Sequence, residues 1–465
     1  MNVPPLSRAN AVRLVALLVI VSLLAPAAVS ALTYDPTEET SLERGNISSA
    51  ANDSTVISVQ GYTFQGNTNP KKPARLVSVD ERGSLEWTHD DNVGGDAWFF
   101  DVDPMPNGNL LVSSPRAGET VVFELDPETQ ERVWQQRFEM TDTHDVAYLG
   151  DDRIAIANMR QWNESTGVSD DRIVVYNRSS EEFTWEWYFR DHYPESTDGG
   201  YNDDWTHVND VDQIGEDRLL LSPRNFDQAI VVDMDSKEIV ERLGSDDDYS
   251  VMREQHNPDW LLSENGTPTI LVADSENNRI VEYAKEDGEW VQTWNVGSES
   301  LNWPRDADRL PNGNTLVTDT LNHRIIEITP TGEVVWEYYA TWGPYDAERM
   351  GTGPESSGPT IRDMNASGTY EITGSANLAA GGEETVGFDG RIRATFADTP
   401  LEGPMTEFAL RWAHVTPWLR PVWMSGWDFV WAIGAVLVGF GWASGELIAG
   451  RHKIVAGVRR LADQL

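Results

Sequence analysis

The chain has no cysteine and very little lysine. Only five of its 35 basic residues are lysines, while aspartate plus glutamate number 76, so the formal net charge is −41 over 465 residues. The absence of cysteine excludes a disulfide scaffold, a thiolate metal site and a cysteine nucleophile. The scarcity of positive charge argues against a nucleic-acid partner, because binding to phosphate backbones depends on clustered Lys and Arg.

Acidic residues are spread along the whole chain rather than gathered in a tail. Hydrophobic residues make up an ordinary 40% of the sequence, which excludes an intrinsically disordered acidic protein. At molar salt the Debye length falls to about 3 Å, and repulsion between surface carboxylates is screened. The composition therefore predicts a halophilic protein with a sizeable core.

Two long apolar segments frame the chain. Residues 14–32 carry no charge and follow Arg8 and Arg13, so residues 1–32 are predicted to be a signal peptide or a membrane anchor, with cleavage left open. Residues 427–450 are predicted to form a transmembrane helix. The tail beyond it, residues 451–465, is basic. The positive-inside rule therefore predicts a cytoplasmic C-terminus and places the rest of the chain on the extracellular face of the cell membrane.

The central part of the chain is a repeat. Residues 101–112, DVDPMPNGNLLV, match residues 306–317, DADRLPNGNTLV, and weaker copies begin at Asp145, Asp210 and Asn257. Most intervals are roughly 40 to 50 residues, and Asn-Gly pairs mark tight turns, which is typical of propeller blades with four short strands. The sequence therefore predicts repeated blades.

One blade is incomplete in sequence order. Residues 55–60, 74–79 and 84–88 give three strands with no innermost strand before them. Residues 344–350, PYDAERM, echo residues 304–310, PRDADRL. They are predicted to supply the missing strand, which closes the ring and leaves no open sheet edge.

The predicted fold class is all-β: a six-bladed β-propeller with four-stranded blades over residues 52–350, flanked by the N-terminal signal or anchor helix and the C-terminal transmembrane helix. Residues 33–51 are a predicted linker. Residues 351–426 are predicted to be a linker and a membrane-proximal region, with candidate strands at residues 368–373 and 391–396.

Tryptophan recurs on the last strand of successive blades. Packing of one blade against the next explains this recurrence better than a cofactor site does. The residues concerned are Trp87, Trp134, Trp185, Trp294 and Trp336.

Three of the eight histidines lie where the innermost strands of consecutive blades begin. They are His144, His207 and His256. A single histidine there is most simply a strand cap. Since innermost strands line the channel of a propeller, recurrence in three consecutive blades favours a shared site.

Two kinds of site fit three converging histidines. Neutral imidazoles can bind zinc, but no His-x-His or Glu-x-x-His pair supplies two ligands from one strand, and neither a metal nor another cofactor is predicted. An oxyanion site is favoured, because Asn209 and Arg224 belong to the same blade as His207. An imidazole, an amide and a guanidinium can together bind a tetrahedral anion.

These residues carry a family resemblance. Trp205-Thr-His207-Val-Asn209-Asp, a following strand and Ser222-Pro-Arg224, with His144-Asp145 and Gln255-His256, resemble the aryl sulfotransferase family of exported six-bladed propellers over roughly residues 95–345. The resemblance implies a transiently sulfated histidine at His256. It also implies binding of the sulfuryl oxygens by His144, His207, Asn209 and Arg224. The chain departs from the family by lacking its cysteine pair and by having the membrane segments, and its propeller is shorter between the histidines.

The resemblance implies an enzyme that moves a sulfuryl group from a phenolic sulfate ester to a phenol by a ping-pong mechanism, without a nucleotide donor. The chemistry agrees, because such transfer depends on in-line geometry and on neutralisation of the equatorial oxygens. The alternative is a non-catalytic, membrane-tethered propeller that binds a cell-surface partner. A quinone-dependent dehydrogenase is disfavoured, since the sequence has neither more blades nor a clear calcium-ligand cluster.

Overall fold

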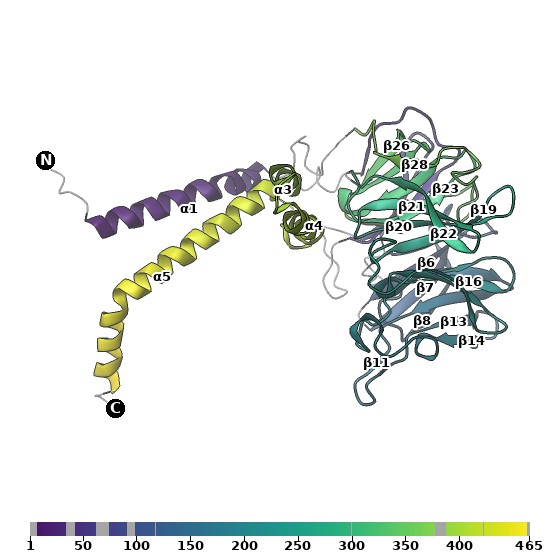
Figure 1. The fold of residues 1–465 in the computed structure, drawn as a ribbon, viewed down its shortest axis with the longest axis horizontal. Helices are drawn as coiled ribbons and strands as arrows, with labels where there is room; N and C mark the ends of the chain where they lie inside the picture. The colour runs from purple at the N-terminus through teal and green to yellow at the C-terminus, as the bar shows by residue number, and fades with distance from the viewer. Residues whose placement is uncertain are drawn as a thin grey trace. The chain divides into compact units, whose positions relative to one another are not determined.

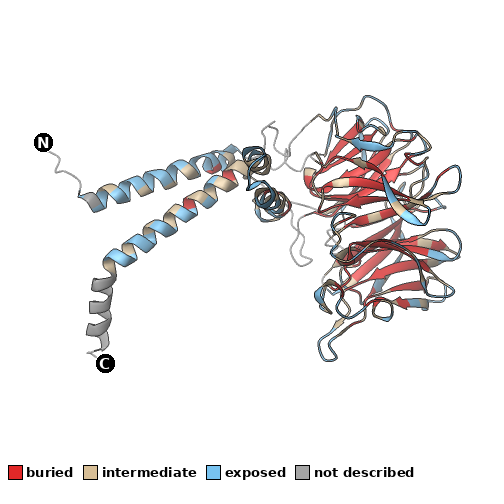
Figure 2. Ribbon diagram, in the orientation of Figure 1, coloured by how far each residue is buried: buried red, intermediate tan, exposed pale blue. Residues whose placement is uncertain are grey.

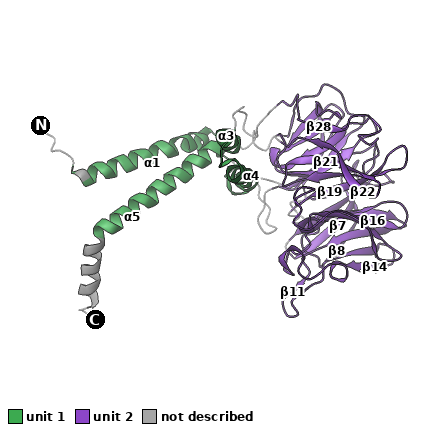
Figure 3. Ribbon diagram, in the orientation of Figure 1, with its two compact units in different colours: residues 1–36, 385–465 green, residues 37–384 purple. Residues whose placement is uncertain are grey.

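The computed structural model describes residues 7–33, 42–61, 74–90, 98–116, 118–298, 300–376, 387–421 and 423–462. The chain divides into two compact units, one of residues 37–384 and one of residues 1–36 with 385–465 (Figure 3). The described part of the larger unit is built of strands and short 3-10 turns, and that of the smaller unit is helical (Figure 1).

The larger unit is a six-bladed β-propeller, as predicted, and each blade has four antiparallel strands from the channel outwards. The first blade consists of β27 (Pro344–Arg349), β2 (Thr55–Val59), β3 (Arg75–Val79) and β4 (Leu85–His89), and the second of β5 (Val102–Pro104), β6 (Leu110–Arg116), β7 (Glu119–Leu125) and β8 (Arg132–Phe138). The third consists of β9 (Val146–Gly150), β10 (Arg153–Asn158), β13 (Arg172–Asn177) and β14 (Glu182–Tyr188), and the fourth of β15 (Val208–Gln213), β16 (Arg218–Pro223), β17 (Gln228–Asp233) and β18 (Ile239–Gly244). The fifth consists of β19 (His256–Leu262), β20 (Pro268–Asp274), β21 (Arg279–Glu286) and β22 (Glu289–Val296), and the sixth of β23 (Pro304–Arg309), β24 (Thr315–Asp319), β25 (Arg324–Ile328) and β26 (Val334–Ala340). The blade strands are mostly buried (Figure 2).

The predicted closure of the ring is confirmed. Strand β27 pairs antiparallel with β2, with Ile57 opposite Ala347 and Thr55 opposite Arg349. The chain thus completes its first blade with its last propeller strand, so the ring is fastened by backbone hydrogen bonds between segments far apart in sequence.

Two flanking segments predicted as linkers contribute strands. Strand β1 (Leu42–Arg44) adds an antiparallel fifth strand to β26, and β28 (Gly368–Tyr370) adds a parallel one to β22. Between β27 and β28 the chain packs on the propeller at Gly358, where a Cβ atom would lie 2.0 Å from the carbonyl oxygen of Leu310. A side chain there is excluded by contact with the backbone.

The two candidate strands after residue 350 have different outcomes. The first is confirmed in part by β28. The second, residues 391–396, is wrong, because these residues lie in helix α3 (Phe388–Phe396). An ion pair of 3.5 Å between Asp389 and Arg393, one helical turn apart, supports the helix.

Three of the recurrent tryptophans share one inter-blade contact. An arginine from the next blade lies over the indole ring and pairs with a glutamate on the third strand of the tryptophan's own blade. Its Cζ is 4.2, 5.0 or 4.5 Å from the ring centroid in the sets Trp134–Arg178–Glu124, Trp294–Arg309–Glu282 and Trp336–Arg349–Glu327. The indole N–H of Trp185 reaches the next blade directly, donating to the Met234 carbonyl at 2.9 Å. The predicted role of the tryptophans in blade packing is confirmed at these four positions.

Aspartates join the innermost strands around the channel. Asp346 accepts the backbone N–H of Val102 at 3.0 Å, and Asp101 accepts that of Val146 at 3.3 Å. Asp145 accepts that of Val211 in the same way. Each of these carboxylates therefore ties its own inner strand to the next one round the ring.

The helical unit contains two helices that are long and apolar enough to cross a membrane. They are the 25-residue span Ala9–Thr33 of α1 (Arg8–Thr33), with mean hydropathy 2.6, and Gly426–Gly450 of α5 (Gly426–Ala462), with mean hydropathy 1.6. Between them in sequence lies α4 (Glu402–Leu419). Helices α1 and α5 are joined by a bidentate ion pair between Arg13 and Glu446, at 2.7 and 2.6 Å. Ser30 donates to Asp428 at 2.6 Å.

The inter-blade ion pair Arg309–Glu282 generates a stability prediction. Both side chains are fully buried and 3.0 Å apart, so Arg309→Met leaves a buried carboxylate without its partner. We expect a loss of about 3–5 kcal/mol in the free energy of unfolding, measured by chemical denaturation. The double variant Arg309→Met with Glu282→Gln should recover part of it, and Arg218→Ala, at an exposed position, is the control. A loss no larger in Arg309→Met than in the control would contradict the prediction.

Candidate functional site

The site is built where the innermost strands enter the channel, and the backbone is irregular there. The pairing register shifts between Val208 and Val211 in β15, and between His256 and Asp259 in β19. His207 and Asn257 have positive φ values of 41° and 37°. Bulges of this kind redirect side chains and occur beside active sites. These irregularities explain why the starts of β15 and β19 do not show the alternating pattern of a regular strand.

His256 is fully buried, and its hydrogen bonds define which nitrogen is free. The Ser275 hydroxyl lies 2.8 Å from Nδ1 and itself donates to the Ala273 carbonyl at 3.3 Å. Since a hydroxyl has one hydrogen, Nδ1 carries the proton that Ser275 accepts. Nε2 therefore presents a lone pair, and it has no hydrogen-bond partner. Burial, followed by the positive charges of Arg305 and Arg224, lowers the pKa of His256 well below its usual range.

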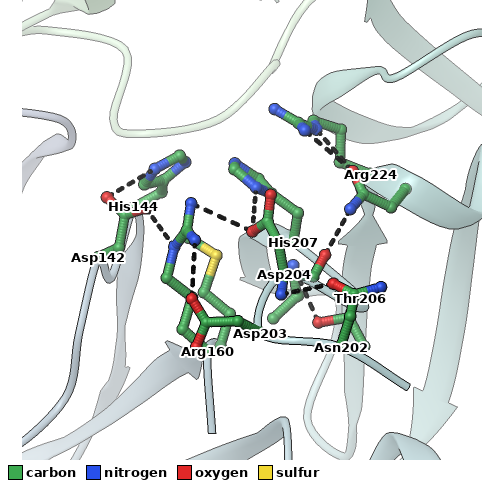
Figure 4. Close-up of polar contacts among 12 residues, drawn as sticks. Asp142, His144, Arg160, Asn202, Asp203, Asp204, Thr206, His207 and Arg224 are labelled. Carbon is green, nitrogen blue, oxygen red and sulfur yellow. Dashed lines mark hydrogen bonds and ion pairs between the residues drawn. The ribbon is translucent and has the colours of Figure 1, made fainter. Parts of the chain in front are cut away.

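His144 and His207 lie edge to face, with ring centroids 5.0 Å apart (Figure 4). Nδ1 of His207 is 2.8 Å from Asp204, and Nε2 of His144 is 3.5 Å from Asp142. Arg160 joins the two carboxylates, with Nε 2.7 Å from Asp142 and Nη2 3.2 Å from Asp204. Burial lowers the pKa of both histidines, so both imidazoles are neutral near pH 7.

Asn209 and Arg224 come from the same blade, as predicted. Asn209 donates to the Gln255 carbonyl at 2.9 Å, which fixes its amide beside His256, and its Oδ1 is buried without a hydrogen-bond partner. The Arg224 guanidinium is held by Asn225 at 2.9 Å and lies 3.5 Å from Glu254. Its side chain is 14% exposed, so it can reach a bound anion while its position is set.

The structure adds two residues, besides Arg160, to the predicted site. The Tyr345 hydroxyl is 2.8 Å from Nδ1 of His144, and its ring centroid is 6.0 Å from that of His256. Arg305 lies over the Tyr345 ring, 4.4 Å from its centroid. Both precede a channel aspartate, as His144 precedes Asp145, so the same register rule would have found them. Arg160 has no such signal in the sequence.

Carboxylates, not histidines, form the clusters that could hold a metal in the described residues. Two groups bring three ligand atoms within 4.8 Å of one another. They are Asp145 with Asp210 and Asp212, and Asp227 with Asp246 and Asp247. Neither group contains a histidine. The Arg224 guanidinium and the Asn209 amide are donors of the kind that bind an anion.

Solved structures match the chain at low sequence identity. A protein of unknown function from Bacteroides caccae is 12% identical, with 62% of this chain and 93% of that chain covered and a TM-score of 0.43. Virginiamycin B lyase from Staphylococcus aureus is 11% identical, with 51% and 69% covered and a TM-score of 0.34. Hydrazine synthase from Kuenenia stuttgartiensis is 13% identical, with 55% and 70% covered and a TM-score of 0.35. These similarities carry no functional argument.

No curated protein sequence matches the chain. The sequence profile of the family described as Arylsulfotransferase (ASST), by contrast, matches residues 49–256. That range includes His144, His207, Asn209 and Arg224 and ends at His256. The resemblance of this chain to the aryl sulfotransferase family is thereby confirmed over residues 49–256.

Proposed function

We propose that the protein transfers a sulfuryl group from a phenolic sulfate ester to a phenol through a sulfated His256. The observation that carries this proposal is the buried Nε2 of His256, which has no hydrogen-bond partner, in a site where Arg305 and Arg224 are the positive charges that act most strongly on the imidazole. A neutral imidazole is a nucleophile. The arginines offset the negative charge of the incoming sulfate group.

The first half-reaction forms the sulfated enzyme. The Nε2 lone pair attacks sulfur, the bond between sulfur and the phenolic oxygen breaks, and the donor leaves as phenolate with the electron pair of that bond. Arg224 and Asn209 hold the sulfuryl oxygens, while bound anion raises the pKa of His207 and His144 and favours their donating forms. In-line geometry and charge neutralisation supply most of the rate enhancement in transfers of this kind.

The second half-reaction regenerates His256. The acceptor phenol attacks sulfur, loses its proton, and the N–S bond breaks with its electrons returning to Nε2. His207 suits the proton transfer, because Asp204 orients its ring and its Nε2 is free. Since the donor phenol leaves before the acceptor enters, the kinetics are ping-pong.

We propose that both apolar helices anchor the propeller on the extracellular face of the membrane, with the C-terminus in the cytoplasm. Basic residues after the second helix support this orientation. The contacts from Arg13 to Glu446 and from Ser30 to Asp428 support retention of the first helix. Its removal would leave Glu446 unpaired in an apolar segment, which is costly.

Activity is tested with 4-nitrophenyl sulfate as donor and phenol as acceptor, in molar salt. We expect acceptor-dependent release of 4-nitrophenol, its loss in His256→Ala, and a fall of about 10²-fold or more in kcat for Arg224→Ala. His192→Ala and Arg218→Ala, outside the site, should keep wild-type rates. Failure of the wild type over a panel of aryl sulfates and phenols would instead favour the non-catalytic binding propeller.

The lowered pKa of His256 predicts the pH dependence of the first half-reaction. Protonation removes the Nε2 lone pair, so activity is present above the pKa of His256 and is lost as the pH falls through it. Because that pKa lies well below the ordinary 6.5, kcat/KM for the donor should stay level from pH 8 through 6.5 and decline only at lower pH. A decline centred at or above pH 6.5 would show that the pKa of His256 is not lowered and would contradict the prediction.

Retention of the first helix is tested by intact mass spectrometry of the membrane-extracted protein. We expect the mass of a chain that keeps residues 9–33. Glu446→Gln should weaken the resistance of the protein to extraction by alkaline carbonate, whereas Glu407→Gln, on α4, should not. A mature chain that begins after Ala31 would contradict the proposal.

A further inference from the structure

The innermost strands bring a set of buried carboxylates into the central channel. None of them is more than 9% exposed. They are Asp101, Asp103, Asp145, Asp210, Asp212, Asp259, Asp306, Asp308, Asp346 and Glu348. So many acidic groups out of contact with solvent need positive charge, protons or both.

Two other buried acids in this propeller are paired with arginine. Asp274 is 2.6 Å from Arg279, and Asp319 is 2.7 Å from Arg324. For Asp145 and Asp210, by contrast, the charges that act most strongly are other carboxylates. Asp145 and Asp210 therefore lie among carboxyl groups rather than beside an arginine as Asp274 and Asp319 do.

Three of these carboxylates have the geometry of a cation site. Asp145, Asp210 and Asp212 each place one oxygen within 4.8 Å of the other two. Asp210 is 3% exposed, and its Oδ2 is buried without a hydrogen-bond partner. Asp212 and Asp145 are the two charges that act most strongly on Asp210. An oxygen left unsatisfied among carboxylates is an available ligand, because an unpaired buried acceptor costs free energy.

We propose that Asp145, Asp210 and Asp212 bind one divalent cation of the calcium class in the channel. Hard cations take carboxylate oxygens, and Ca²⁺ accepts six to eight of them at about 2.3–2.6 Å. Ligand atoms that all lie within 4.8 Å of one another can contact one such ion, and the flexible coordination of Ca²⁺ suits a site made of carboxylates better than the strict octahedral geometry of Mg²⁺. Asp103 and Asp259, which act on the same carboxylates, and water can fill the other positions.

The ion competes with protons for this site. Because the ligands must lose their protons, affinity for the ion rises with pH.

The position of the site gives the ion a structural consequence. Asp145 directly follows His144, and Asp210 directly follows Asn209. A cation bound by Asp145, which directly precedes β9, and by Asp210 and Asp212 of β15 holds these neighbouring inner strands together beside the residues of the site. It stabilises the propeller whether or not the proposed sulfuryl transfer occurs, so its test is independent of that reaction.

The test uses the purified full-length protein in detergent at constant molar KCl and pH 7.5. Metal content is measured by inductively coupled plasma mass spectrometry after dialysis, and the thermal unfolding midpoint is measured with EDTA, with CaCl₂ and with MgCl₂. We expect one calcium ion per chain, a midpoint several degrees higher with CaCl₂ than with EDTA, and a smaller shift with MgCl₂.

The variant Asp212→Asn should lose the bound ion and the calcium-dependent shift. Asp308→Asn, which alters another buried channel carboxylate, should keep both, and so should Asp247→Asn in the second acidic group. A wild type with no stoichiometric metal and the same midpoint in EDTA and CaCl₂ would overturn the proposal, because the channel then holds protons instead. Retention of the ion by Asp212→Asn would equally overturn it.

Discussion

The contact between an aspartate at the channel and the backbone N–H of the next inner strand is the constraint on which the propeller depends. It occurs from Asp346 to Val102, from Asp101 to Val146 and from Asp145 to Val211. A buried carboxyl oxygen that accepts a backbone N–H makes a hydrogen bond strengthened by the low local dielectric. At these three junctions the aspartate that marks the blade start in the sequence is therefore the residue that joins consecutive blades.

The same constraint positions the site. Once the aspartate is fixed, the residue before it is held at the level where the inner strand enters the channel. His144, Asn209, Arg305 and Tyr345 all occupy this position. The residue that joins the blades and the residue that lines the site are thus adjacent in sequence. The site residue can differ from blade to blade while the aspartate that follows it keeps its contact with the next strand.

How far the sequence predicts the structure depends on whether a segment repeats. The blades, the closure of the ring and the three site histidines could be predicted, because the same pattern recurs in several copies of the repeat. Strands β1 and β28 lie outside the repeat and are strands because they pair with the sheet edges at β26 and β22. The local sequence of these segments does not predict that pairing. Arg160 was missed for a related reason: its role comes from contacts with Asp142 and Asp204 across a loop insertion, and neither spacing nor motif announces it.

Closure of the ring by β27 determines when the site forms during folding. Arg349 and Thr55 are 294 positions apart, and contacts of such sequence separation form late and slowly. Tyr345, which reaches His144, lies on that last strand. A partly synthesised or partly translocated chain therefore has all three histidines but lacks Tyr345 and Arg305, which complete the site. The finished arrangement exists only in a molecule whose first and last blade strands have met.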